Sequence, residues 1–258
     1  MLPSIYISHG SPSLALMENS TTNFLKNLPK SFETPKYILV ISAHWVTNNL
    51  KILYEDKPST IHDFYNFPRE LYELTYEAPS SKEKNDEVIE LLQSNKIEIQ
   101  KEYSRGGYDH GVWSPLSFLY PKADIPIIQI SLPISYDVKE LIYLGEVLSP
   151  LRDDTLIVAS GSITHNLRDM IWDENSTKIK PYAKIFKDWV VEKIENADVD
   201  SLINYKKEAP YLSLNHPSLE HFLPLFVSLG ASKNKVGKSL HDVYMYENLS
   251  MDTILFKE

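Results

Sequence analysis

Residues 37–45 read YILVISAHW and contain the pattern from which the fold class follows. The first six, Tyr37–Ser42, form an apolar, β-branched run, which is typical of a strand covered on both faces of a parallel sheet. Further runs of this kind predict strands elsewhere in the chain. They lie at Ser4–Ser8, Leu50–Tyr54, Ile125–Leu132 and Thr155–Ser160, with two more around Asp242–Tyr246 and Met251–Phe256.

Amphipathic helical patterns lie between these runs. The spacing predicts a helix over Lys82–Ser94, a second through Leu141–Leu151, a third that opens at Pro181, and a fourth from near Pro217 to Gly230. We interpret their apolar stripes as core packing. Strands that alternate with helices predict an α/β fold, with a mostly parallel central sheet flanked by helices. No repeat or linker divides the chain, so we expect one domain over residues 1–258.

The composition excludes several classes of protein. The 258 residues include 26 lysines and arginines against 35 aspartates and glutamates, a formal net charge of −9. This acidity argues against nucleic-acid and anionic-membrane binding. The absence of cysteine excludes thiolate zinc sites, iron–sulfur clusters and cysteine nucleophiles. The first residues lack a basic region and no apolar run is long enough to span a bilayer, so we predict a cytoplasmic protein.

Histidines stand where three predicted strands end. His9 follows SIYIS, His44 follows YILVIS and His165 follows TLIVAS. In open α/β sheets, ligands bind in the crevice beyond the carboxyl ends of the strands. A lone histidine is most often structural, but three at equivalent points predict a metal site or an acid/base site.

Of four further histidines, two are candidate site residues and two are expected to be structural. His110 lies in RGGYDHGVWSP, which holds three of the eight glycines and so predicts a functional loop. His221 and Glu220 fall in the first turns of the fourth helix, where adjacent side chains diverge by about 100° and one of them would reach a metal. We expect His216 to cap or pack, and His241 to be structural.

His62 lies in an aromatic segment, TIHDFYNFPRELYELTY. One interpretation is a loop that faces a substrate, with His62 and Tyr65 as candidate binding residues. The other is a satellite cluster packed under a long loop.

Widely separated histidines at a sheet crevice suit a catalytic metal with open coordination positions, because closed zinc sites usually take their ligands in close sequence pairs. Two chemistries fit such a site, namely zinc-dependent hydrolysis and the oxygen chemistry of non-haem iron(II). The spacing of the residues leaves both open.

Taken together, the motifs resemble those of the class III extradiol ring-cleavage dioxygenases, the LigB-like superfamily, in its DOPA 4,5-dioxygenase-like branch. The resemblance runs in order from residue 8 to about residue 231. Tyr65 and Asn66 stand where small residues are common in that branch. The matching segments are SHGSPSLAL, VISAHW, TIHDFYNFPRELYELTYEAP, GYDHGVWSPLSFLYPKADIPIIQIS, VASGSITHNLR and EHFLPLFVSLGA.

The resemblance implies the roles of five histidines. His9, His44 and His221 correspond to the ligands of one metal ion. His165 corresponds to a base beside the metal, and to a fourth ligand when substrate is absent. His110 corresponds to a second active-site histidine that supports binding of substrate or oxygen.

The implied reaction is extradiol cleavage of a small catechol-type diol by dioxygen at a mononuclear non-haem metal, which gives a muconic semialdehyde. Iron(II) is the metal expected for activity, and zinc is expected in purified material because it outcompetes iron(II) for imidazole. A zinc-dependent hydrolase that uses the same histidines is the alternative. A non-catalytic binding module of this fold fits less well, because all five expected histidines are present.

Overall fold

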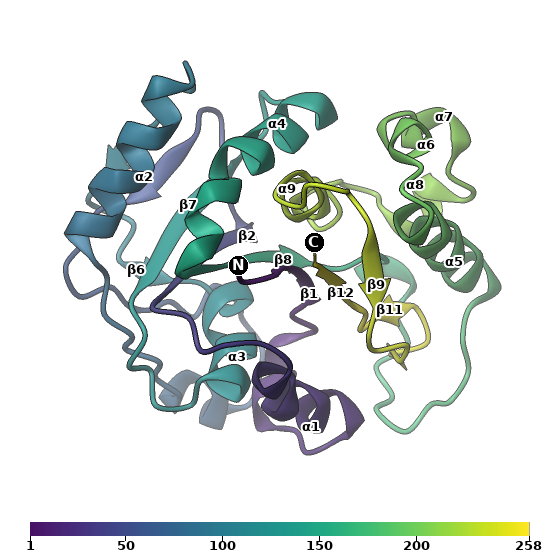
Figure 1. Ribbon diagram of the computed structural model, residues 1–258. Coiled ribbons are helices and arrows are strands. Elements are labelled where there is room, and N and C mark those ends of the chain that lie inside the picture. Colours follow the sequence, from purple (N-terminus) through teal and green to yellow (C-terminus); the bar gives the residue numbers. More distant parts are fainter. Residues whose placement is uncertain (258) are drawn as a thin grey trace.

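The run that begins at Tyr37 forms the middle of the main sheet. In the computed structural model, which describes residues 1–257, β2 (Tyr37–Thr47) pairs in parallel with β7 (Ile127–Pro133) and with β8 (Thr155–Gly161). Strand β8 also pairs in parallel with β1 (Ser4–Ser8) (Figure 1). The predicted parallel central sheet is therefore confirmed.

The sheet becomes mixed at both edges. Strand β12 (Thr253–Phe256) runs antiparallel to β1 and to β9 (Gly237–Ser239). At the other edge β3 (Lys51–Leu53) runs antiparallel to β7 and parallel to β5 (Gln100–Glu102). Over residues 1–257 the order of this sheet is β5-β3-β7-β2-β8-β1-β12-β9.

Among residues 1–257, four short strands lie outside the main sheet. The strand predicted around Asp242–Tyr246 is one of them, since β10 pairs with β11 in a separate two-stranded sheet. The four are β4 (Ser59–Thr60), β6 (Gly107–Tyr108), β10 (Tyr244–Met245) and β11 (Leu249–Ser250).

Helices cover both faces of the main sheet (Figure 1). The α-helices are α1 (Ser20–Asn27), α2 (Lys82–Ser94), α3 (His110–Leu119), α4 (Val138–Leu148), α5 (Pro181–Glu195), α6 (Val199–Ile203), α7 (Tyr205–Glu208), α8 (Leu212–Asn215) and α9 (Pro224–Gly230). Short 3₁₀ helices are η1 (Pro12–Leu16), η2 (Leu28–Ser31), η3 (Arg69–Glu73), η4 (Ser149–Asp153) and η5 (Leu167–Asp169).

The alternation of side chains along β2 divides the core into two clusters. Ile38 and Val40 pack into the cluster that also holds residues of α1 and α3. Leu39 and Ile41 pack into the cluster formed with α2, α4, α5 and α9. Because both faces of β2 are buried, polar chemistry is left to the ends of the strands.

The helix predicted from Pro217 begins only at Pro224, so this prediction was wrong at its start. The carbonyl oxygen of His221 accepts hydrogen bonds from Tyr6 Oη at 2.8 Å and from the backbone N–H of Ser162 at 2.9 Å. These bonds fix the segment to the sheet in a turn. Proline lacks an N–H, so Pro224 suits the first position of the helix that follows. The expected divergence of two adjacent side chains on a helix does not apply here.

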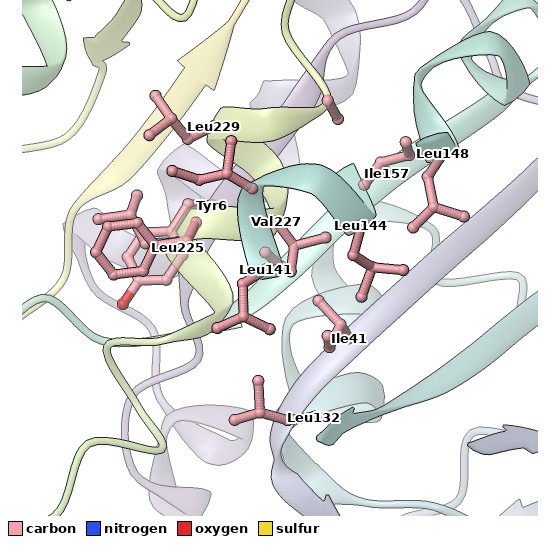
Figure 2. Packing of buried hydrophobic residues seen from close by; sticks show 14 of the residues in the cluster. Tyr6, Ile41, Leu132, Leu141, Leu144, Leu148, Ile157, Leu225, Val227 and Leu229 are labelled. Carbon is pink, nitrogen blue, oxygen red and sulfur yellow. The ribbon is translucent and has the colours of Figure 1, made fainter. Parts of the chain in front are cut away.

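Helices α4 and α9 touch backbone to backbone. A Cβ atom added to Gly145 would meet the carbonyl oxygen of Val227, and one added to Gly230 would meet that of Ile142. Around this contact the leucines of both helices pack on the sheet (Figure 2). The glycines therefore set how closely these helices approach each other.

We predict that Gly145→Ala destabilises the protein. Alanine favours a helix over glycine by about 1 kcal/mol, but steric overlap with a packed backbone costs about 1–3 kcal/mol. The overlap should dominate, because the carbonyl oxygen that the added Cβ would meet belongs to the backbone of α9. Thermal or urea unfolding measures the change, and Lys139→Ala, at an exposed position on the same helix, is the control. Unchanged stability of Gly145→Ala would show that α4 and α9 separate freely.

Candidate metal centre and active site

Five histidines from separate elements line one cavity of about 420 Å³. His9 follows β1, His44 lies in β2, His110 begins α3, His165 follows β8 and His221 precedes α9. The other lining residues are Gly10, Ser11, Pro12, Ala43, Asp63, Phe64, Tyr65, Phe67, Leu167, Met170, Trp172, Glu220 and Leu249. The cavity lies at the carboxyl ends of the parallel strands, as the fold class predicts.

His44 lies within β2 and not after it. The strand was predicted to end at Ser42 but continues to Thr47, with a shift of register against β7 between Ile41 and Val46. Such an irregularity bends a strand and re-aims its side chains, which is common beside active sites. Here it coincides with the position of His44.

Ser160 fixes the tautomer of His9. The Ser160 hydroxyl donates to the carbonyl oxygen of Gly111, and its oxygen lies 2.8 Å from His9 Nδ1. Because its proton is already donated, the serine oxygen accepts from His9 Nδ1–H. His9 Nε2 is left with a free lone pair.

Asp63 fixes the tautomers of two rings, those of His44 and His110. Its Oδ2 lies 2.9 Å from His110 Nδ1 and 3.2 Å from His44 Nδ1, and its Oδ1 accepts from the backbone N–H of His110 at 2.8 Å. Burial alone would raise the pKa of Asp63, but the hydrogen bonds from the two histidines outweigh it and hold this pKa well below its usual value. An ionised carboxylate only accepts, so both rings carry their proton on Nδ1.

Asp63 was not predicted as a site residue from the sequence, although it is adjacent to His62 in the aromatic segment. An acidic residue beside a histidine was the available signal. What the sequence could not supply was the contact, since the partners lie 19 and 47 positions away along the chain, at His44 and His110.

The inner nitrogens of three rings approach one another. His44 Nε2 lies 3.0 Å from His9 Nε2 and 3.3 Å from His221 Nε2. His221 Nδ1 faces Glu220 Oε1 at 3.4 Å, which places its proton on the outer side as well. Ring nitrogens of His9, His44 and His110 also lie within 4.8 Å of one another.

This arrangement fits a metal ion. Lone pairs that face each other across about 3 Å repel, and a cation between them removes the repulsion. Metal-ligating histidines typically donate their other N–H to a carboxylate or another oxygen, as His9, His44 and His221 do here. The imidazoles of His9, His44, His110 and His221, two of them held by the Asp63 carboxylate, form a set of nitrogen donors suited to a divalent transition metal.

Burial keeps the rings in the form that binds a metal. It is the largest cause that lowers the pKa of His9 and His221 well below the usual value, and the neighbouring histidines lower it further. Neutral imidazole offers a lone pair, whereas imidazolium does not. The cluster is therefore ready for a metal at neutral pH.

His165 stacks on His221, with ring centroids 3.5 Å apart and planes 7° from parallel. Its backbone N–H donates to the carbonyl oxygen of Asn215 at 3.1 Å, which holds the segment after β8. Burial lowers the pKa of His165 to about 3, and nearby histidines contribute. The ring is therefore neutral and offers a nitrogen lone pair to a molecule in the cavity.

Part of the aromatic segment faces the cavity, as expected of a substrate-facing loop, and part of it forms a packed cluster. Tyr65 lines the cavity and is 81% exposed. His62 is not among the lining residues described. Its Nε2 lies 3.0 Å from the carbonyl oxygen of Leu74, and its ring contacts Phe64 and Trp113. His62 therefore belongs to the packed cluster behind the cavity wall.

The two histidines expected to be structural lie outside the cavity lining. His216 is buried against Phe222, with Nε2 2.6 Å from the carbonyl oxygen of Ile163. His241 stacks on Phe24 with ring centroids 4.6 Å apart. Both positions agree with the sequence-based interpretation.

Comparison with known proteins agrees with this geometry. The family described as the catalytic LigB subunit of aromatic ring-opening dioxygenase matches residues 3–256. The chain belongs to this family. It is 36% identical to a 4,5-DOPA dioxygenase extradiol of Beta vulgaris, over 92% of this chain and 90% of that protein. It is also 36% identical to a 4,5-DOPA dioxygenase extradiol of Escherichia coli K12, over 89% of this chain and 85% of that protein.

A solved structure shares the fold. The crystal structure of an uncharacterised protein from Escherichia coli K12 superposes with a TM-score of 0.82 at 28% sequence identity, and the match covers 100% of both chains. Among the described residues of this LigB-family protein, no helix has the length and apolar character needed to cross a membrane.

We predict that Asp63→Asn weakens metal binding. An amide has only one accepting oxygen, so it cannot accept from both rings and from the backbone N–H of His110 at once, as the carboxylate does. Loss of such a partner costs about 10–100-fold in metal affinity. Competition with a chromophoric chelator, using iron(II) under anaerobic conditions and zinc separately, measures the affinity. Asp124→Asn, an exposed position away from the cavity, serves as the control. Equal affinities for Asp63→Asn and the unsubstituted protein would show that Asp63 does not orient these rings.

Proposed function

We propose that this protein cleaves a catechol-type aromatic diol with dioxygen by extradiol chemistry and releases a muconic semialdehyde. One observation carries the proposal. The Nε2 lone pairs of His9, His44 and His221 converge in one cavity, and the neutral ring of His165 lies beside them. Membership of the ring-opening dioxygenase family and the named activity of the relatives support it. The catalytic domain proposed comprises residues 1–258.

We assign the metal to His9, His44 and His221, and we propose iron(II) as the metal of the active enzyme. When bound, iron(II) supplies the redox chemistry that allows a diol to react with dioxygen. The protein holds each of these rings from behind, through Ser160 in β8 and Asp63 among others. This support preorganises the ligands before substrate enters.

His165 manages the proton of the substrate. A catechol hydroxyl must lose its proton to bind tightly, and neutral His165 in the cavity wall accepts it at a ring nitrogen. His110, held through Nδ1 and its backbone N–H by Asp63, presents Nε2 to the cavity and orients the substrate. The apolar wall, which includes Phe64 and Met170, limits access of water.

Oxygen consumption with a panel of catechols tests the function. Protein stripped of metal and reloaded with iron(II) under anaerobic conditions should consume one dioxygen per diol and form a yellow semialdehyde. We expect His165→Ala to retain its metal but to lose about 10²–10⁴-fold in rate, the usual contribution of a positioned base. His241→Ala, at a half-buried position outside the cavity, is the control for substitution of a histidine.

Unchanged cleavage by metal-loaded His165→Ala would contradict the role of this residue. Absence of oxygen uptake across the panel, with iron confirmed in the protein, would contradict ring cleavage. Hydrolysis of esters or amides by the zinc-loaded protein without oxygen would then identify the alternative activity.

Metal analysis of two variants separates ligand from supporting histidine. We predict that His221→Ala loses the metal during dialysis, because one of three coordinating nitrogens is removed. His110→Ala should retain the metal and lose activity, because His110 acts on the substrate. The opposite pattern would transfer the third ligand from His221 to His110, which also approaches His9 and His44.

A further inference from the structure

We propose that this cavity selects catechols whose ring substituent is uncharged or carries an ammonium group, and that it disfavours those whose substituent is a carboxylate. Glu220 is the residue that sets this preference. The inference deepens the proposed function and rests on it. It follows from the charges and surfaces that line the cavity beyond the histidines.

The cavity wall offers negative charge and no positive side chain. Its two acidic residues are Asp63 and Glu220, and among residues 1–257 no lysine or arginine lines it. Asp63 is occupied by His44 and His110. Glu220 accepts from Ser218 and His221 through Oε1, so its other oxygen, Oε2, remains for a substituent of the substrate.

Glu220 is placed to meet a ligand. Its side chain is 30% exposed where it lines the cavity. Within the described residues, its hydrogen-bond contacts are both made by Oε1, to Ser218 Oγ at 2.8 Å and to His221 Nδ1 at 3.4 Å. Oε2 is thus available to accept a hydrogen bond from an ammonium or hydroxyl group of a ligand.

Three basic side chains on the neighbouring segments, those of Arg69, Arg105 and Lys180, are paired with carboxylates elsewhere. Arg168, beside the lining residue Leu167, is exposed and is not part of the described lining. The pairs are Arg69 with Glu73 at 2.8 Å, Arg105 with Asp109 at 2.6 Å and Lys180 with Asp169 at 2.6 Å. A carboxylate on the ring substituent would lose water without gaining a lysine or arginine partner among the described lining residues.

Aromatic residues form the outer part of the wall. Tyr65, Phe67 and Trp172 line the cavity, and Trp172 is 57% exposed while its ring contacts Tyr246 at a centroid distance of 4.9 Å. The faces of aromatic rings are negative, so they attract an ammonium group and bury an alkyl group, but they repel a carboxylate. The aromatic wall and Glu220 therefore both favour an ammonium group over a carboxylate on the substrate.

Two catechols of similar size and opposite charge measure the effect of the substituent's charge on binding. Dopamine ends in an ammonium group and 3,4-dihydroxyphenylacetate in a carboxylate, and 4-methylcatechol is an uncharged reference. We expect dopamine to bind at least about tenfold more tightly than 3,4-dihydroxyphenylacetate, since a charged hydrogen bond or its loss changes affinity by this order. The uncharged reference should lie between them or close to dopamine.

Calorimetric titration of the iron(II)-loaded protein without oxygen measures the three dissociation constants. We expect Glu220→Gln to reduce the ratio between the two charged catechols by about tenfold. Glu70→Gln, which removes an exposed charge outside the cavity, should leave this ratio unchanged. Oxygen uptake is then measured with the same ligands.

Equal binding of dopamine and 3,4-dihydroxyphenylacetate, or tighter binding of the latter, would overturn the proposal. A ratio that survives Glu220→Gln would remove Glu220 as its cause. If the ligands bind with the expected ratio but no oxygen is consumed, the selectivity stands and ring cleavage fails. If oxygen is consumed without selectivity, ring cleavage stands and this inference fails.

Discussion

The proton on the outer nitrogen of four cavity histidines, His9, His44, His110 and His221, is the constraint on which the site depends. An imidazole whose Nδ1 donates to an oxygen must present its lone pair at Nε2. Ser160 imposes this on His9, and Asp63 imposes it on His44 and His110. Without these oxygens the rings could turn or exchange tautomers, and the lone pairs would no longer be directed at one point.

The fold brings these partners together because parallel strands end at one edge of the sheet. Ser160 lies at the end of β8, between β1 and β2, where it reaches the histidine that follows β1. The same strand continues to Gly161, where the absence of a side chain lets the carbonyl oxygen of His221 approach. Tyr6, buried in the neighbouring strand, binds that oxygen too. Packing and ligand geometry are therefore set by the same strands.

The sequence was sufficient for features that depend on local patterns. The strand Ser4–Ser8 and the helix Lys82–Ser94 have the predicted bounds, and histidines after three apolar runs located the cavity. The sequence was insufficient where contacts between distant residues determine the bounds of an element. The start of α9 depends on bonds from Tyr6 and Ser162 to the preceding turn, and the course of β2 past Ser42 depends on its pairing with β7. Local periodicity contains none of these contacts.

The sulfur content of the chain has a consequence for its durability. There is no cysteine, so no thiolate can be oxidised by a reaction that handles dioxygen. Among the described residues of the cavity wall, Met170 carries the only sulfur. Its oxidation would place a polar sulfoxide in an apolar wall, and methionine sulfoxide reductases can reverse this change. Oxidation of the Met170 thioether is therefore reversible, whereas oxidation of a cysteine to a sulfinic or sulfonic acid would generally be permanent.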